Sequence, residues 1–459
     1  NLTFGGSLNW NFFNIYNYSN SLFNFENFGR GNELDWRVYG RFTQRFNNTE
    51  EGSKSKVSSA YYSLMIDYSK SYRTYQDQTH EDRFFNYGYV GRFDIYSTPT
   101  YEYVDEYGDD GVLDLYEHNG FRDTLVEFTP SDVNSSFAAV TKQYYDIYAN
   151  DPEGHYENLF QIQQGGGLRN GDAPQSVYGI WNNIGTPYNA YQKSEADQFR
   201  VTGSGSINIG DHSISLGFEY EQRIDRAFSS GRQGPIGLWT IARQYMNSHI
   251  AELDREDVIA YTYYGTYPQV TYSRLNASPG EYAGAAEGDA QTFFDYSVRE
   301  ELGLDTDGVD WVNIDALDPD FFKLSMFSPD ELLNQGNNFF EWYGYDHTGE
   351  KVKGTTSIDD YFTEFDENGN YVRNIGAFQP IYAAGYIMDK FSFDDIIFNV
   401  GVRVDVFDAN QPVLKDKYLL YESRTAAEAR ASEADWAVVP ESIGDDYVVY
   451  VNDVNNPTQ

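Results

Sequence analysis

The strongest constraint on the fold is a stretch of strictly alternating residues near the C-terminal end of the chain. From Phe398, apolar side chains fall on every second position through Val400, Val402 and Val404, and polar or small residues fill the positions between them. A period of two predicts a β-strand with two unlike faces, and residues 378–408 predict two such strands joined by a tight turn. The apolar face would pack on a core in a soluble protein and would meet lipid in a transmembrane barrel.

Five further stretches alternate in the same way and predict long strands. They cover residues 1–15, 33–47, 57–75, 198–209 and 213–225. The connections alternate in length, with short ones at 48–56, 210–212 and 392–395 and very long ones at 76–197 and 226–377. Short turns at one end and long loops at the other are typical of outer-membrane barrels, whereas such long loops are unusual in a compact soluble domain. We therefore predict an all-β fold, an antiparallel transmembrane β-barrel with large, partly helical extracellular loops.

This prediction divides the chain into barrel segments and loops. The segments are 1–75 (three barrel strands), 76–197 (a long extracellular loop with extra strands), 198–225 (a barrel hairpin), 226–377 (a long extracellular loop with helices), 378–408 (a barrel hairpin) and 409–459 (the start of a further extracellular loop). Within the loops we expect strands at 86–97 and 121–128, an amphipathic helix over 238–253, and a helix that begins with a capping box at Ser328 and ends at Gly336.

Composition excludes several classes of function. The formal net charge is −39, from 71 acidic and 32 basic residues, so the chain repels nucleic acid. Without cysteine it can form neither disulfides nor thiolate sites. The six histidines form no HExxH motif, and among so many carboxylates a pair at catalytic spacing carries no information. We expect no enzymatic activity and no cofactor other than a candidate calcium ion.

Four stretches resemble the barrels of TonB-dependent outer-membrane receptors, in particular the large receptors that begin with a carboxypeptidase-regulatory-like domain and a plug. They are HNGFRDTLVEFTPSDVN (118–134), SVYGIWNNIGTPYNAY (176–191), DQFRVTGSGSINIGDHSISLGFEYEQRIDRAFS (197–229) and YAAGYIMDKFSFDDIIFNVGVRVDVFDANQPVLKDKY (382–418). The resemblance implies a plugged barrel of 22 strands, of which this chain would supply a part. No plug and no TonB box is recognised in this sequence.

The resemblance also implies a location and partners. The barrel would lie in the outer membrane, in contact with its lipid and lipopolysaccharide, and a periplasmic TonB complex would drive it through the plug. A surface lipoprotein is a candidate partner. We expect a receptor that captures a substrate with its extracellular loops and imports it through the lumen. Two alternatives stay open: a barrel of the same family that serves surface assembly or secretion, and a secreted, soluble β-rich glycan-binding protein or glycoside hydrolase.

Five charged residues on the polar side of the expected strands are candidates for the lumen wall. They are Arg37, Arg41, Arg45, Arg403 and Asp405. Such residues could hold an anionic group or face the plug, or they could pair with carboxylates on neighbouring strands, which is an ordinary arrangement in barrels.

The loops contain two further kinds of candidate site. Asp305, Asp307 and Asp310 resemble a calcium loop without its closing glutamate, as does the stretch 105–111, and a solvated acidic turn is the alternative. Four aromatic residues could stack a sugar or a peptide, or could form the core that large loops need. These residues are Trp181, Tyr188, Trp342 and Tyr343.

Overall fold

The computed structural model separates the chain into two units, Asn1–Ala409 and Asn410–Gln459. It describes residues 1–47, 56–104, 114–148, 154–280, 282–288, 290–354, 356–393, 395–413, 424–431 and 439–449. Strands make up 45% of the described residues, among which helices are few. The second unit contains β13 (Arg424–Thr425), α7 (Ala426–Ala431) and β14 (Val448–Val449), and β13 pairs with β14. None of the helices in the described residues has the length and apolar character needed to cross a membrane.

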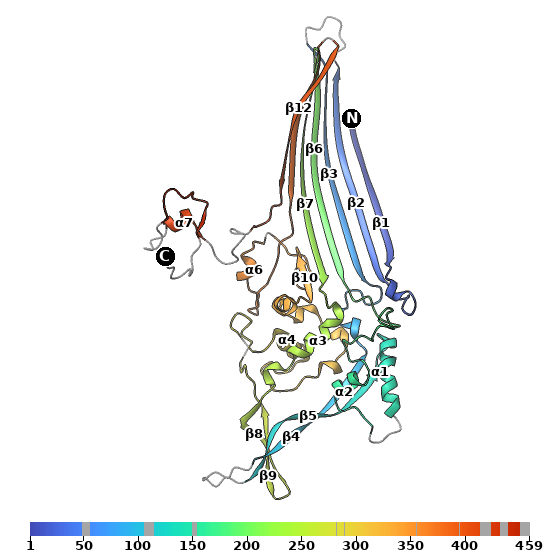
Figure 1. Ribbon diagram of the computed structural model, residues 1–459, viewed down its shortest axis with the longest axis vertical. Helices are drawn as coiled ribbons and strands as arrows, with labels where there is room; N and C mark the ends of the chain where they lie inside the picture. Colours follow the sequence, from blue (N-terminus) through green and yellow to red (C-terminus); the bar gives the residue numbers. More distant parts are fainter. Residues whose placement is uncertain are drawn as a thin grey trace. The chain divides into compact units, whose positions relative to one another are not determined.

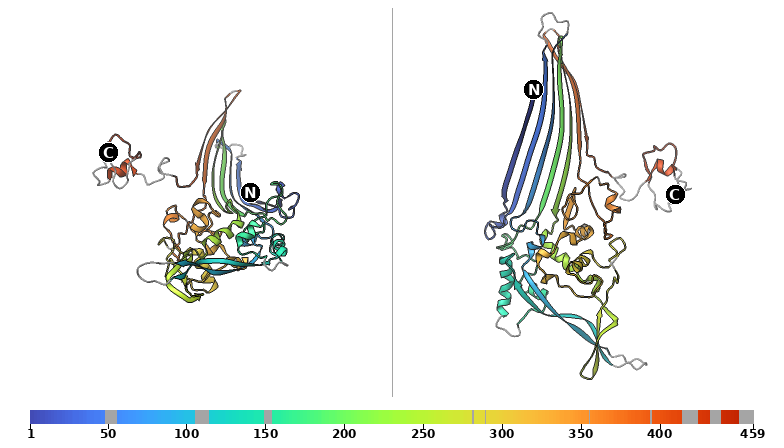
Figure 2. Two further views of the ribbon diagram at one scale, coloured as in Figure 1. Left: turned by 60° about the horizontal axis from the view of Figure 1, so that its bottom comes forward. Right: turned by 180° about the vertical axis from the view of Figure 1, so that it is seen from behind.

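Seven long antiparallel strands form the main sheet of the first unit, in the order β1-β2-β3-β6-β7-β11-β12. They are β1 (Leu2–Ile15), β2 (Gly29–Asn47), β3 (Val57–Asp77), β6 (Gln192–Ile209), β7 (His212–Ser230), β11 (Ile381–Phe393) and β12 (Ile396–Asp408). Figures 1 and 2 show them side by side in one curved sheet. Within the described residues the sheet is open, with β1 and β12 at its edges. The prediction of antiparallel β structure is confirmed, and the barrel closure stays a prediction.

The strand register gives this sheet two unlike faces. One continuous row of cross-strand partners is apolar or glycine on all seven strands: Leu2, Phe42, Leu64, Gly203, Phe218, Gly385 and Val404. The adjacent row on the other face is mostly polar: Thr3, Arg41, Met65, Thr202, Glu219, Ala384 and Asp405. The apolar side chains are not packed on a core, because Leu2 is 64% exposed, Phe218 53% and Val404 61%.

The two long insertions, residues 78–191 and 231–380, fold together into what we call the insertion lobe. Its sheet has the order β4-β5-β9-β8 and contains β4 (Gly91–Val104), β5 (Leu115–Pro130), β8 (Leu253–Tyr264) and β9 (Tyr267–Arg274), with β5 and β9 parallel. Its helices are α1 (Ser135–Tyr148), α2 (Leu159–Gln164), α3 (Leu238–Tyr245), α4 (Phe293–Leu302), α5 (Pro329–Leu333) and α6 (Asp360–Thr363). A short strand, β10 (Phe340–Tyr343), pairs with the lobe end of β7 and so attaches the lobe to the main sheet.

The hydrophobic cores of the first unit lie in or against the insertion lobe. The larger core surrounds α3 and α4, where Trp239 and Phe294 are fully buried and the rings of Phe294 and Phe327 stack with centroids 4.3 Å apart. The smaller core lies between β4, β5 and α1 and includes Phe93 and Phe137. Burial of large aromatic side chains is the main stabilising contribution available to this lobe.

Several element boundaries differ from the sequence-based expectations. The first extra strand begins at Gly91, because residues 84–88 form a 3-10 turn. The helix expected over 238–253 ends at Tyr245, since Met246 is extended and Asn247 is left-handed (φ 63°). The capping box at Ser328 is present, but α5 ends at Leu333 with Asn334 as its left-handed cap, earlier than Gly336. Other elements, among them α1, α4, β8 and β9, were not expected from the sequence.

The capping-box residue Glu331 links two helix starts and generates a prediction. Its carboxylate accepts hydrogen bonds from the backbone N–H of Ser328 (2.8 Å) and of Phe294 in α4 (3.2 Å). Burial raises the pKa of Glu331 from 4.5 to about 7. Between these values the folded protein holds a proton that the unfolded chain has lost, so this group destabilises the fold as the pH rises.

We therefore predict that the stability difference between wild type and Glu331→Gln changes with pH. The free energy of unfolding of the wild type, minus that of the variant, should fall as the pH rises from 4.5 to about 7. In this range the Glu331 carboxyl of the wild type is ionised in the unfolded chain but still protonated in the folded one, and the variant has no such group. Urea unfolding followed by circular dichroism measures it. Glu341→Gln, at an exposed position of the same lobe, is the control and should keep the wild-type pH dependence. A pH-independent difference for Glu331→Gln would contradict the prediction.

Candidate functional site

A ladder of ion pairs crosses four strands on the polar face of the main sheet. Asp67 on β3 lies 3.0 Å from the guanidinium of Arg37 on β2 and 3.1 Å from that of Arg200 on β6. Arg200 in turn lies 3.7 Å from Glu219 on β7. The side chain of Asp67 is only 2% exposed because the two arginines cover it. Arg37 thus pairs across strands, which was one of its two expected roles.

The other residues predicted for the lumen wall lie on the same polar face. Arg41 donates to the sulfur of Met65 (3.4 Å), and the guanidinium of Arg45 lies 5.5 Å from the centre of the Tyr61 ring. Within the described residues, neither arginine forms an ion pair. Arg403 and Asp405 are 2.9 Å apart on the edge strand β12 and both are half exposed. The polar face therefore combines an ion-pair ladder around the buried Asp67, an exposed pair at the sheet edge, and two arginines that have no ion pair within the described residues.

A small cavity lies where this polar face reaches the insertion lobe. It has a volume of 340 Å³ and is lined by Phe13, Tyr75 and Tyr188, among others. The backbone N–H of Tyr188 donates to Asp77 (2.9 Å), and the hydroxyl of Tyr75 donates to Glu33 on β2. The sequence-based candidate Tyr188 therefore lies at the end of the polar face.

The remaining aromatic candidates lie in other places. Trp342 belongs to the larger core of the lobe, where its indole N–H donates to the carbonyl of Arg373 (3.0 Å). Tyr343 packs on Phe378 with ring centroids 4.5 Å apart. Trp181 meets Phe23 edge-on at 6.2 Å. Trp342 therefore has the core role that was the alternative to ligand stacking.

Two of the three candidate calcium ligands already accept hydrogen bonds from within the protein. Asp305 accepts from the backbone N–H of Asp307 (3.1 Å), and Asp307 accepts from the side chain of Asn276 (2.8 Å) and the N–H of Gly280 (2.7 Å), while Asp310 is exposed. Among the described residues there is no group of three or more acidic or histidine side chains that could hold a metal ion. Residues 105–111 lie outside the described residues. Calcium binding stays a prediction.

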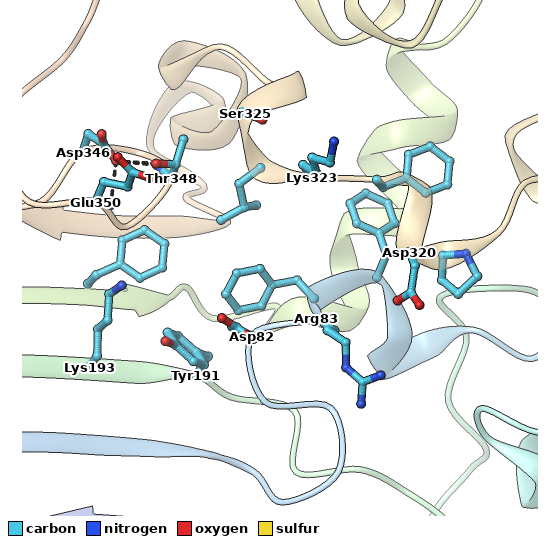
Figure 3. Close-up of a pocket in the computed structure, with 16 residues that line it drawn as sticks. Asp82, Arg83, Tyr191, Lys193, Asp320, Lys323, Ser325, Asp346, Thr348 and Glu350 are labelled. Atoms are coloured by element: carbon cyan, nitrogen blue, oxygen red, sulfur yellow. Dashed lines mark hydrogen bonds between the residues drawn. The ribbon is translucent and has the colours of Figure 1, made fainter. Parts of the chain in front are cut away.

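A larger cavity of 650 Å³ lies between the insertion lobe and the lobe ends of β6 and β7 (Figure 3). Five segments that are distant in the sequence line it: 82–85, 191–193, 228, 319–325 and 346–350. By strand alternation Lys193 lies on the same side of β6 as the apolar residues Phe199 and Val201. The cavity therefore lies on the same side of the sheet as the exposed apolar residues, at the lobe end of the strands, and not on the polar face.

The walls of this larger cavity are aromatic and its rim carries both signs of charge. The rings of Phe85 and Phe322 stack at 4.6 Å, and those of Phe84 and Tyr191 meet edge-on at 5.0 Å. The rim residues are Asp82, Arg83, Asp320, Lys323, Asp346 and Glu350. Aromatic walls with a polar rim suit a ligand that has a flat apolar face and several hydrogen-bonding groups.

Lys193 is the cation held deepest in this arrangement. Its amine donates to the carbonyl of Gly349 (2.6 Å) and lies 5.4 Å and 5.0 Å from the ring centres of Phe228 and Tyr345. Burial lowers the pKa of Lys193, although Asp82 and Asp346 act in the opposite direction. Figure 3 places its amine opposite the turn formed by Asp346, Thr348 and Glu350. No ion pair of Lys193 occurs within the part of the chain that the structure describes.

Sequence reasoning did not identify this cavity. Its lining residues come from five segments, and no spacing in the sequence links them. The local signal that exists, the Asp346-His-Thr-Gly sequence, indicates only the tight turn in which Asp346 accepts from the N–H of Thr348 (2.9 Å). Comparison of the chain with protein-family models, with curated proteins and with solved structures finds no match.

The ion-pair ladder leads to a stability prediction. Asp67→Ala leaves Arg37 and Arg200 close together without their shared carboxylate. Because these two arginines are 37% and 26% exposed, water can reach them, and we expect a loss of about 1–3 kcal/mol. Unfolding of the purified chain in detergent, followed by circular dichroism, measures the cost. Asp405→Ala removes a pair that is exposed at the sheet edge and should have a clearly smaller effect. Equal effects of the two substitutions would contradict the prediction.

Proposed function

We propose that this chain forms part of the barrel of an outer-membrane receptor of the TonB-dependent type. The observation that carries the proposal is the two-faced sheet, in which a continuous apolar row is exposed on one face while the other face carries an ion-pair ladder around the buried Asp67. A soluble protein rarely exposes a large continuous apolar surface. Lipid would cover the apolar face, and the polar face would line a wet lumen.

The extent of the exposed apolar band supports the membrane assignment. On β1 it runs from Leu2 to Phe12, and on β12 from Phe398 to Val406. These spans match the ~9–11 residues that a tilted strand needs to cross a bilayer. Trp36 and Tyr68 pack together at 5.4 Å toward the lobe end of this band, as expected for an aromatic girdle at the membrane surface.

The insertion lobe would be the extracellular part that captures the substrate. It contains cores of its own, so it can hold binding surfaces in place. The cavity at Tyr188 lies where the polar face meets the lobe, and it offers an aromatic position at the entrance to the proposed lumen. Import driven by a periplasmic TonB complex rests on the resemblance alone. A barrel of the same family that serves assembly or secretion would expose the same apolar face.

The proposal predicts opposite labelling of neighbouring positions on β12. The chain has no cysteine, so each single-cysteine variant carries one reactive thiol. In native membranes, Val402→Cys should react with a lipid-soluble maleimide and resist a charged, water-soluble one. Asn399→Cys, three residues away on the polar face, is the matched control and should show the reverse preference.

The contradictory outcome is equally specific. Rapid reaction of Val402→Cys with the water-soluble reagent, in the cellular protein that contains this chain, would place the apolar face in water. The soluble glycan-binding alternative would then replace the receptor, provided that the protein also fractionates without membranes.

A further inference from the structure

The arginine at the end of β9 is held between two aromatic rings. The guanidinium carbon of Arg274 lies 3.9 Å from the centre of the Phe121 ring and 4.1 Å from that of Trp311. Its one hydrogen bond in the described residues is a long one, to the carbonyl of Ile250 (3.4 Å). No ion pair of Arg274 occurs in the described residues, although the chain has 71 acidic and only 32 basic residues.

Most N–H donors of this guanidinium have no acceptor among the described residues. A guanidinium has five N–H donors, and the bond to Ile250 uses one of them. Burial between these rings lowers the pKa of Arg274, as expected where the charged form has lost water. None of its nitrogens is a buried atom without a partner, so the unused donors are open to the cavity that Arg274 lines, where water or a ligand can accept from them.

Arg274 lines a cavity of 510 Å³ in the insertion lobe, separate from the two described above. Phe121, Asp123, Glu252, Arg255 and Trp311 also line it. The cavity's other arginine, Arg255, is already paired with Glu117 at 2.7 Å. Of the two arginines that line this cavity, Arg274 is therefore the one without an ion pair in the described residues.

The charges and walls of the cavity restrict the ligand. Two carboxylates, Asp123 and Glu252, would repel a doubly charged phosphate more strongly than a singly charged group. The walls include Trp311, which is 55% exposed, and Phe121, which is 39% exposed, and such rings favour a flat apolar partner. A carboxylate can accept two parallel N–H bonds from one guanidinium edge.

We propose that this cavity binds a small aromatic or otherwise planar monocarboxylate, whose carboxylate pairs with the free edge of Arg274. The site lies in the lobe and does not depend on the membrane assignment. The competing role for Arg274 is purely structural: its contacts with Phe121 on β5 and with Trp311 would hold β9 against these two segments.

Titration calorimetry with benzoate tests the proposal on the purified chain. Wild type should bind benzoate saturably in the millimolar range, and benzamide, which has the same shape without the charge, should bind at least about 10-fold more weakly. Inorganic phosphate should also bind more weakly than benzoate. This comparison needs no variant, so it stands even where a substitution impairs folding.

Variants then locate the site. Arg274→Gln should weaken benzoate binding about 10-fold or more, and Arg274→Lys should weaken it as well, because an ammonium cannot form the two parallel bonds. Arg92→Gln, at an exposed arginine that pairs with Asp94, is the control and should bind as wild type does. Circular dichroism checks that each variant is folded.

Three results would overturn the proposal. One is the absence of saturable benzoate binding to wild type. Another is equal binding of benzoate and benzamide, or tighter binding of phosphate. The third is a folded Arg274→Gln variant that binds benzoate as wild type does, which would leave Arg274 with a structural role only.

Discussion

An apolar sheet face without a core against it is the constraint on which the rest of the structure depends. Apolar surface transferred from water gains about 25 cal/mol per Å², and this sheet forgoes that gain along all seven strands, from Leu2 on β1 to Val404 on β12. Backbone hydrogen bonds and the Asp67 ladder hold the strands together, but neither accounts for the exposed valines and aromatic rings. The proposed lipid environment would account for both faces at once, because it would solvate the apolar face and leave the charged one to water.

The insertion lobe solves a different physical problem. Its two insertions are strongly acidic and could not remain ordered without apolar burial of their own. They supply it through residues such as Trp239, Phe294 and Phe137, which are fully buried in two separate cores. Two cations lie close to aromatic rings in or next to the lobe. Lys193 is on the lobe end of β6 and Arg274 is in the lobe, and neither has an ion pair in the described residues. In so acidic a chain, cations kept from carboxylates are the most informative feature of the candidate binding sites.

Sequence periodicity predicted the sheet because alternation is a local property. The side chains of Phe398, Val400 and Val402 point to one face whatever the rest of the chain does, and the same holds for the other six strands. The capping box at Ser328 was predictable for the same reason. Strand ends were less predictable, since β2, β6 and β7 continue into the lobe, where the insertions pack on them and the alternation no longer separates apolar from polar residues.

The cavities could not be predicted in this way. The stacked guanidinium of Arg274 depends on Phe121 and Trp311, which come from separate segments and meet only in the folded lobe. Aromatic residues selected by composition alone were a mixed set: Trp342 belongs to the core, while Tyr188 lines a cavity. Arg37 was correctly placed on the polar face, but its partner Asp67 could be identified only once the strand register was known.

Quenching of Trp10 by brominated lipids tests the central claim most directly. Trp10 lies on the apolar face of β1 and is 64% exposed, whereas Trp239 and Trp342 are buried in the insertion lobe. With the protein in vesicles that contain brominated acyl chains, wild-type fluorescence should be quenched, and Trp10→Phe should remove part of that quenching, with the remainder from Trp36 on the same face. If the lipids do not quench wild type, or if water-soluble acrylamide reaches Trp10 freely in the vesicles, the apolar face does not meet lipid and the account is wrong.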